Sequence, residues 1–575
     1  MIKLLKYLKP FGTAIVGIFV LVFIQSIADL YLPTLMADIV NKGMIPGNTH
    51  YIWRLGGIML VIAGGGAVAA ITSSFLSSKV AMAYSRNLRS KVFSRVQSYS
   101  LNEFDKIGTA SLITRTTNDI NQVQTVLIMV LRMMVSAPMM GIGGIIMAIS
   151  MNRRLTMILA IALLILVVFI AIVGQRVMPL FKFIQSKLDK LNLVSRENLT
   201  GIRVIRAFNR IDDEKRRFDE ANLDLTNTTI KANKIMAGML PIVTLIMNLT
   251  GVAIIWFGSR YIDLGDLQIG DMMAFLQYAI QIMMALLMLS MMFVFIPRGE
   301  ASAVRINEVL DMAPEINDPV NPKKLGDRKG YIEFRDVSFS YPGAEKPAIH
   351  NITFSATPGE VTAIIGGTGS GKSTLINLIP RFYDVDKGAV LINGVDVREI
   401  PQEILRKKIG FVPQKALLFT GSIIENIKFG KEDATEEEVK QAAEIAQASE
   451  FISGMEDGFD SEIAQGGANV SGGQKQRLSI ARALIRRAEV YIFDDSFSAL
   501  DFKTDAKLRT ALKKEIKNAT VIMVAQRVST VMEADRIIVL DQGEIAGIGN
   551  HKELLSTCNV YREIVASQLT EEELA

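Results

Sequence analysis

A glycine-rich stretch, VTAIIGGTGSGKST, has the residues and spacing of a phosphate-binding loop. An apolar run leads into the pattern G-x-x-x-x-G-K-S, and a helix-forming run follows. Glycines let backbone N–H groups point at phosphate oxygens, a lysine neutralises the β and γ phosphates, and a hydroxyl reaches Mg²⁺. The candidate nucleotide ligands are Gly366, Gly369, Gly371, Lys372, Ser373 and Thr374. Because a strand and a helix flank this loop, we interpret it as a phosphate-binding loop rather than as a glycine-rich turn that binds no ligand.

Two further stretches add charge and dipoles to this chemistry. The strand VYIFD ends at Asp494, where a carboxylate on a second strand can hold the water shell of Mg²⁺ beside Ser373. The stretch VSGGQ, residues 470–474, opens a helix with basic residues. On physical grounds it is either an anion-binding helix N-terminus without an anion of its own or an ordinary helix cap.

The composition of the chain that must position these residues indicates a membrane protein. Of the 575 residues, 50% are hydrophobic, and the mean hydropathy is +0.30. A net charge of +5 at this length gives no support to a nucleic-acid partner. The single cysteine, Cys558, excludes intrachain disulfides and multi-cysteine metal sites.

Six long apolar segments, each near the ~20 residues that cross a bilayer, precede residue 300. They lie at 13–36, 56–77, 133–150, 155–175, 237–258 and 272–296. Two polar loops with helical periodicity, about 78–130 and 176–236, separate them, and the second is rich in Lys and Arg. The positive-inside rule therefore places both loops and both termini in the cytoplasm.

The sequence divides into two domains of different class. Residues 1–300 are expected to form an α-helical transmembrane bundle, and residues 301–330 a linker with Pro and Asn. Alternating β-rich sequence starts at YIEFRDVSF, so residues 331–575 are expected to form an α/β P-loop domain.

Taken together, these motifs closely resemble the ATP-binding-cassette (ABC) family. The resemblance rests on Walker A at 366–373, the signature VSGGQ at 470–474, Walker B ending at Asp494, and SALD at 498–501. With six spans ahead of them, they resemble a half-transporter of the ABC exporter class over essentially the whole chain. The resemblance implies ATP and Mg²⁺ as cofactors and a second half-transporter as partner. It also implies ATP contacts from the signature residues Ser471, Gly472, Gly473 and Gln474.

Other positions match the family pattern. Tyr341, in FSYPG, occupies the place of the aromatic residue that stacks on adenine, although a strand-end tyrosine in the core is the alternative. Gln414, in FVPQ, resembles the glutamine that links the Mg²⁺ site to the membrane part. Glu462 matches the acidic member of the exporter cross-talk loop, but the residues 464–466 depart from the usual pattern there.

Two catalytic positions depart from the family pattern. The general base is usually glutamate, and this chain has Asp495; the switch residue is usually histidine, and this chain has Gln526. An aspartate carboxylate would sit about 1 Å further from the attacking water, and such a misplacement can cost roughly a hundredfold in rate. Glutamine can hydrogen-bond a phosphate oxygen but cannot carry the charge of an imidazolium. Both changes predict a pocket that binds ATP and hydrolyses it slowly.

The combination of an impaired P-loop side with an intact signature predicts a heterodimer. In ABC dimers, as the resemblance implies, each ATP lies between the P-loop side of one chain and the signature of the other. This chain would then supply the degenerate pocket and complete its partner's hydrolytic pocket, as in bacterial heterodimeric multidrug exporters. A homodimer with two slow sites is the alternative.

Within the membrane half, three features bear on coupling and substrate. Short coupling helices are expected around 103–110 and 204–212. The methionine-rich last span suits a cavity for apolar shapes, although helix packing explains most of these residues equally well. Asp29 and Gln25, one turn apart in the first span, should face the bundle interior, where Asp29 either binds a cation or makes interhelical hydrogen bonds.

The predicted function is ATP-driven export of lipophilic or drug-like compounds across a bacterial plasma membrane. Export of a single lipid, peptide or siderophore fits the same scaffold. A third possible function, of a different class, is an ATP-gated channel, and passive ion conductance would identify it.

Overall fold

The computed structural model describes residues 1–568 and the side chains of all of them except residues 293 and 294. The chain separates into two compact units. The first contains Met1–Gln97 and Ala110–Met312, and the second contains Ser98–Thr109 and the chain from Ala313 onward. The first unit is helical and the second is α/β, so the predicted fold class is confirmed.

Six helices of the first unit are long and apolar enough to cross a membrane. They are α2 (Gly12–Asp38), α3 (Thr49–Gln97), α6 (Asn118–Met151), α7 (Arg153–Thr200), α9 (Ile211–Asp263) and α10 (Ile269–Asp311). Each contains one predicted span, but most are far longer than the ~20 residues needed to cross hydrocarbon. The predicted polar loops are largely continuations of these helices.

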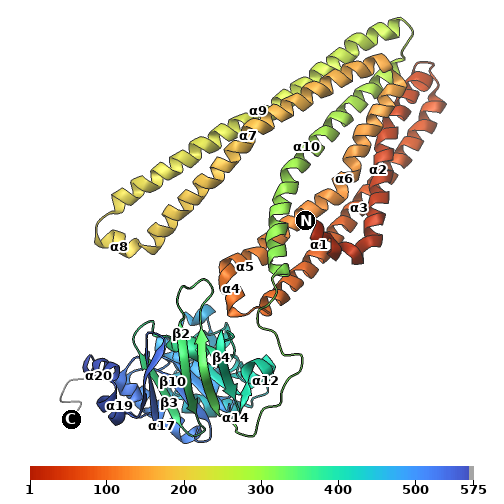
Figure 1. Cartoon of the computed structure of the whole chain (residues 1–575). Helices are drawn as coiled ribbons and strands as arrows, with labels where there is room; N and C mark the ends of the chain where they lie inside the picture. Colours follow the sequence, from red (N-terminus) through yellow and green to blue (C-terminus); the bar gives the residue numbers. More distant parts are fainter. Residues whose placement is uncertain (569–575) are drawn as a thin grey trace. The chain divides into compact units, whose positions relative to one another are not determined.

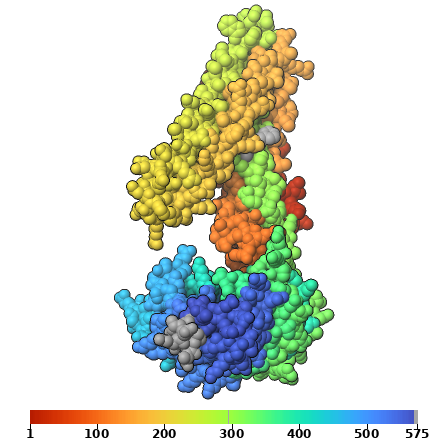
Figure 2. Space-filling view, turned by 60° about the vertical axis from the view of Figure 1, so that its left-hand side comes forward, coloured from red at the N-terminus to blue at the C-terminus, as the bar shows by residue number. Residues whose placement is uncertain are grey.

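Shorter elements complete this unit. They are α1 (Ile2–Leu5), a 3₁₀ helix (Lys6–Phe11), a π-helical segment (Ile39–Met44), α5 (Thr109–Thr116) and α8 (Ile202–Ala207). Helices α7 and α9 lie side by side as a long hairpin with α8 at its tip, which also stands out in the space-filling view (Figures 1 and 2). Helix α10 packs on α6 and α2, where the Tyr278 hydroxyl donates to the Leu30 carbonyl at 2.7 Å.

A short segment from early in the chain belongs to the second unit. It contains α4 (Leu101–Ile107), which begins with a capping box between Ser100 and Glu103. Glu103 Oε1 also accepts a hydrogen bond from the backbone N–H of Glu315 at 2.9 Å. Short helices α4 and α8 therefore exist close to the two predicted coupling-helix positions.

The second unit is built on a six-stranded sheet of order β12-β11-β3-β10-β9-β6. Its strands are β3 (Val361–Gly366), β6 (Ile409–Val412), β9 (Val490–Asp494), β10 (Thr520–Val524), β11 (Arg536–Asp541) and β12 (Glu544–Gly549). All neighbours pair in parallel except the edge strand β12. The carboxyl ends of β3, β6, β9 and β10 therefore share one edge, where open α/β sheets bind ligands.

Two smaller sheets accompany it. An antiparallel sheet of order β2-β1-β4-β5 contains β1 (Ile332–Phe339), β2 (Ile349–Ala356), β4 (Lys387–Ile392) and β5 (Val395–Asp396), and β7 (Gly421–Ser422) pairs with β8 (Glu462–Ile463). Buried side chains of the two larger sheets, such as Phe334 and Ile492, share one apolar core.

The helices that cover these sheets are mostly short. They are α11 (Lys372–Leu378), α12 (Gln402–Lys407), α13 (Ile423–Lys428), α14 (Glu436–Ile445), α15 (Ser449–Ser453), α16 (Gly472–Leu484), α17 (Phe502–Glu515), α18 (Val528–Val531), α19 (His551–Thr557) and α20 (Asn559–Ala566). Three-residue 3₁₀ turns lie at Val397–Glu399, Gly458–Asp460 and Gln465–Gly467. Helix α11 packs on β3, β9 and β10, which fixes the glycine-rich loop that precedes it.

The junction between the units lies just after α10. Helix α10 continues to Asp311, and β1 begins at Ile332. The first part of the expected 301–330 linker is therefore helical, and the domain limits of 1–300 and 331–575 stay predictions.

Candidate nucleotide site

The glycine-rich loop joins β3 to α11 and requires glycine at two of its positions. Gly369 and Gly371 have φ angles of 81° and 96°, in the left-handed region that side chains disfavour. A Cβ at Gly371 would also lie 2.6 Å from Ile349 Cγ2, so no side chain fits there. The backbone can therefore curl tightly ahead of α11, whose N-terminus carries a positive dipole end.

The ammonium group of Lys372 is held at this loop. Its Nζ donates to the carbonyl oxygens of Gly366 at 2.9 Å and Gly367 at 2.6 Å. Burial lowers the pKa of Lys372, while the charges of Asp495 and Asp494 oppose this effect. The loop thus brings a cation next to two carboxylates, all near the end of one sheet.

Oxygen ligands suited to a hard cation lie beside the loop. Ser373 Oγ donates to Asp494 Oδ1 at 3.4 Å, and Asp494 is 8% exposed. Burial raises the pKa of the Asp494 carboxyl, and the hydrogen bond from Ser373 is the largest opposing effect. Together with the Gln414 carboxamide, these hydroxyl and carboxylate oxygens are the donors that Mg²⁺ prefers. The predicted metal ligands fit this cation.

Three predicted residues meet at Asp495. Its Oδ2 accepts hydrogen bonds from Gln526 Nε2 at 2.9 Å and from Gln414 Nε2 at 3.4 Å. The Asp495 backbone has a φ of 47°, unusual for a residue other than glycine, and its N–H donates to the Val524 carbonyl at 3.0 Å. Burial raises the pKa of its carboxyl, opposed first by the bond from Gln414. Asp495 is therefore fixed by both backbone and side-chain contacts.

One residue at this site has no signal in the sequence analysis. Gln568, just after α20, donates from Nε2 to the Gln526 carbonyl at 2.9 Å and accepts from the Val528 N–H at 2.8 Å. These two bonds brace the backbone on both sides of residue 527. The contact spans 42 positions of sequence, so neither periodicity nor a local motif could predict it.

Tyr341 lies next to the first turn of α11. Its hydroxyl and Thr374 Oγ1 are 3.1 Å apart, and its ring meets Phe339 and Tyr383 edge-on. The side chain is 38% exposed, so part of the ring is open to a ligand. The structure thus brings together the glycine-rich loop and the aromatic residue that the sequence analysis associates with adenine.

The signature residues form a separate group at the start of α16. Ser471 caps the helix: its Oγ accepts from the Gln474 N–H at 3.3 Å, and its own N–H donates to Gln474 Oε1 at 2.8 Å. Ser471 and Gly472 are exposed. Within residues 1–568, no hydrogen bond joins residues 471–474 to the glycine-rich loop. The predicted ATP ligands therefore divide into two groups.

Comparisons with known families account for both units. Residues 15–286 match the ABC transporter transmembrane region, and residues 349–498 match the ABC transporter family. The second match includes the glycine-rich loop, the signature residues, Asp494 and Asp495.

Comparisons with individual proteins extend over nearly the whole chain. An uncharacterised ABC transporter ATP-binding protein of Mycobacterium tuberculosis is 42% identical, over 98% of this chain and 97% of its own. The ATP-dependent lipid A-core flippase of Desulfotalea psychrophila is 33% identical, over 97% of each chain. The solved structure of a bacterial Atm1-family ABC exporter with ATP bound superposes with a TM-score of 0.80 at 26% identity, over 97% of this chain and 99% of that one.

Proposed function

This chain belongs to the ABC transporter family as a membrane-spanning, ATP-hydrolysing exporter, and from this premise we propose that it is one subunit of a heterodimer that exports lipophilic, drug-like compounds. In the proposed pair, this chain supplies a degenerate ATP pocket on its P-loop side. Its signature turn completes the hydrolytic pocket of a different half-transporter.

The observation that carries the proposal is the environment of Asp495. Burial raises the pKa of its carboxyl, so weak basicity is not what limits it as a general base. The short side chain of Asp495 limits its action as a general base. Backbone and amide contacts fix the position of its carboxylate, so it cannot move closer to the attacking water. An aspartate that cannot shift toward the attacking water loses roughly a hundredfold in rate when misplaced by about 1 Å.

Gln526 strengthens this interpretation. Its amide donates to Asp495, so it orients the carboxylate rather than carrying charge to a phosphate. A histidine at this position could be protonated and stabilise negative charge on the γ-phosphate, and a carboxamide cannot. Two substitutions in one hydrogen-bonded group thus favour slow hydrolysis with retained ATP binding.

We assign the remaining residues to nucleotide and metal binding. The loop amides and Lys372 would bind the phosphates, and the ring of Tyr341 would stack on adenine. Ser373, Gln414 and Asp494 would hold Mg²⁺, which neutralises charge on the β- and γ-phosphates when bound. These side chains would bind ATP and Mg²⁺ whether hydrolysis in this pocket is fast or slow.

The signature turn has a different role in this proposal. Its capping box fixes the first turn of α16, so exposed backbone N–H groups and the helix dipole face outward. Residues Ser471 to Gln474 would contact the γ-phosphate of an ATP bound to the partner. Conversely, the partner's signature would close the pocket of this chain.

We propose a multi-pass location in a bacterial plasma membrane with the ATP-binding domain in the cytoplasm. The relatives in M. tuberculosis and D. psychrophila are bacterial. The excess of Lys and Arg in the two long loops supports cytoplasmic loops and termini.

The test is the ATPase rate of this chain purified alone, compared with the paired repair Asp495→Glu and Gln526→His. We expect the native chain to be nearly silent and the double variant to hydrolyse at least roughly tenfold faster, because both the base and the charged switch are restored. Brisk hydrolysis by the native chain, unchanged by the repair, would contradict the heterodimer and establish a homodimer with Asp495 as a sufficient base.

A lipid is a second candidate substrate, because one relative is named a lipid A-core flippase. ATP-driven flipping of a fluorescent lipid in proteoliposomes, without dye efflux from the same vesicles, would support this candidate. Dye efflux without lipid flipping would support the drug-like substrate.

A further inference from the structure

The helical unit contains a partly polar cavity that ATP binding does not explain. Its volume is about 390 Å³, within the ~300–1,000 Å³ range of small-molecule sites. Its lining includes Asp29 from α2 and both Gln277 and Gln281 from α10. Four methionines, from α2, α3, α6 and α10, complete a lining that is soft and adaptable.

Asp29 is the charged group of this cavity. It is half-buried, and the side chain of Gln25, one turn earlier, hydrogen-bonds to it. Within the described chain, no Lys, Arg or His forms an ion pair with Asp29. A carboxylate within a membrane span is costly unless a cation accompanies it. The cavity is therefore electrostatically suited to a positively charged ligand.

Gln281 adds a second acceptor. Its Nε2 donates to the backbone carbonyl of Asp29 at 3.1 Å, which fixes the side chain against α2. Its Oε1 is buried and has no hydrogen-bond partner among the described residues. Buried acceptors are normally satisfied, so this oxygen points to a missing donor or cation.

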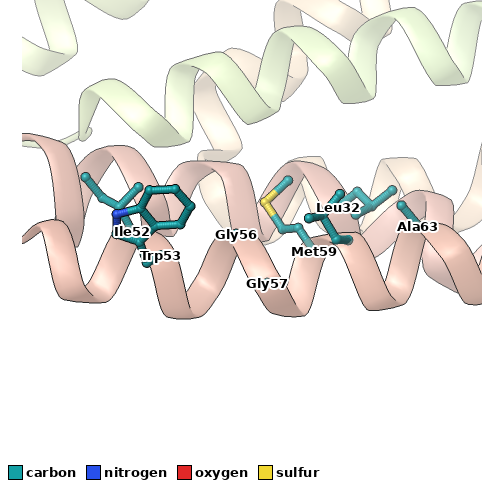
Figure 3. A pocket seen from close by; sticks show the side chains of 8 residues that line it. Leu32, Ile52, Trp53, Gly56, Gly57, Met59 and Ala63 are labelled. Carbon is teal, nitrogen blue, oxygen red and sulfur yellow. The ribbon is translucent and has the colours of Figure 1, made fainter.

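An apolar hollow adjoins this cavity. It has a volume of about 650 Å³ and shares Leu32 and Met59 with the partly polar cavity. Figure 3 shows Trp53 and Met59 on either side of Gly56 and Gly57. Because glycine has no side chain, these two positions leave space along α3. A bulky apolar group can occupy this hollow while a charged group lies next to Asp29.

We propose that the Asp29 cavity binds lipophilic organic cations, with the charge between Asp29 and Gln281 and the apolar body extending past Leu32 and Met59. This inference rests on the proposed export of lipophilic compounds and specifies their charge. It assigns Asp29 the role of selecting cations, with Gln25 orienting its carboxylate.

The test is equilibrium binding of radiolabelled tetraphenylphosphonium to the full-length chain in nanodiscs, without ATP. Neutral triphenylphosphine oxide is the comparison probe. For Asp29→Asn, we expect tetraphenylphosphonium affinity to fall at least about tenfold, because a charge pair in a poorly hydrated site is lost, with little change for the neutral probe. Equal affinity for tetraphenylphosphonium in both forms would overturn the proposal.

Asp38→Asn is a matched control on the same helix. Asp38 pairs with Lys42 at 2.8 Å and does not line the cavity, so its substitution should leave tetraphenylphosphonium binding unchanged. A tenfold loss in this variant would show that the effect on binding is not specific to the cavity carboxylate and would overturn the Asp29 site.

A second measurement does not depend on the folding of a variant. In the wild-type chain, an apolar carbodiimide should label Asp29, and tetraphenylphosphonium should protect it. Labelling without protection would overturn the proposal. Because neither measurement uses ATP, failed binding leaves the proposed ATP-driven export untouched, and a chain that binds but does not export refutes only the proposed function.

Discussion

The proposed catalytic edge, formed by Gln414, Asp495 and Gln526, and the signature turn at Ser471 reach their geometries in different ways. The signature turn is local, because Ser471 and Gln474 satisfy each other within one helical turn. The catalytic edge collects Gln414, Asp495 and Gln526 from the ends of three strands. A local motif survives as a unit, whereas an assembled edge can change one side chain at a time while the sheet stays intact. In the proposed heterodimer, this difference would let the domain lose hydrolysis in its own pocket while its signature turn still completes the partner's pocket.

The largest effect should come from the signature turn. In the proposed pair, we expect Ser471→Arg to lower ATP turnover about a hundredfold, because removing one hydrogen-bond donor to a developing transition-state charge costs an enzyme about 10²–10³ in rate. The measurement is steady-state ATPase activity of the pair. Thr435 caps α14 with the same type of capping box, so Thr435→Arg is a structural control that should keep turnover within about twofold. Similar losses of ATP turnover in both variants would show that Ser471 acts only as an ordinary helix cap.

An intermediate effect should appear in nucleotide affinity on the P-loop side. We expect Tyr341→Ala to weaken ATP binding by this chain about tenfold, because stacking of a base on an aromatic ring is lost. Tyr341→Phe removes only the hydroxyl that contacts Thr374 and should retain most of the affinity. Fluorescence titration of the isolated chain measures both. If the Phe variant binds as weakly as the Ala variant, the hydroxyl contact rather than stacking determines affinity.

The smallest effect should come from the catalytic edge. In the proposed pair, where the partner's pocket would perform most of the hydrolysis, we expect Asp495→Asn to reduce turnover less than about twofold. The same substitution of the partner's base should abolish most activity. The measurement is the steady-state ATPase rate of the pair carrying either Asp495→Asn or the substitution of the partner's base. Equal losses of activity would show that the two pockets contribute equally to hydrolysis.

The sequence predicts well what depends on short segments. Apolar windows locate all six membrane helices, and the strand–loop–helix pattern locates Gly371 and Lys372 at the N-terminus of α11. Helix ends are predicted less well. An apolar window measures the thickness of hydrocarbon, but a polar helix continues until a cap or a turn ends it, so α7 extends to Thr200 rather than 175.

Contacts between distant residues are outside the reach of such patterns. Gln568 braces the Gln526 backbone from the end of α20, and Gln281 meets Asp29 across 252 positions. Nothing in the neighbouring sequence distinguishes these glutamines from exposed ones. Their partners are fixed only when helices and strands have packed, so the tertiary structure is needed to find them.

The placement of α4 has a practical consequence for dividing this protein. Segment 98–109 is a natural part of the second unit although more than 200 residues separate it from Ala313. A polypeptide that starts at Ala313 would leave the Glu315 amide without the Glu103 carboxylate that it binds in the intact chain. A soluble ATP-binding fragment intended for titration or crystallisation should therefore be supplied with residues 98–109 as an added peptide or an engineered fusion.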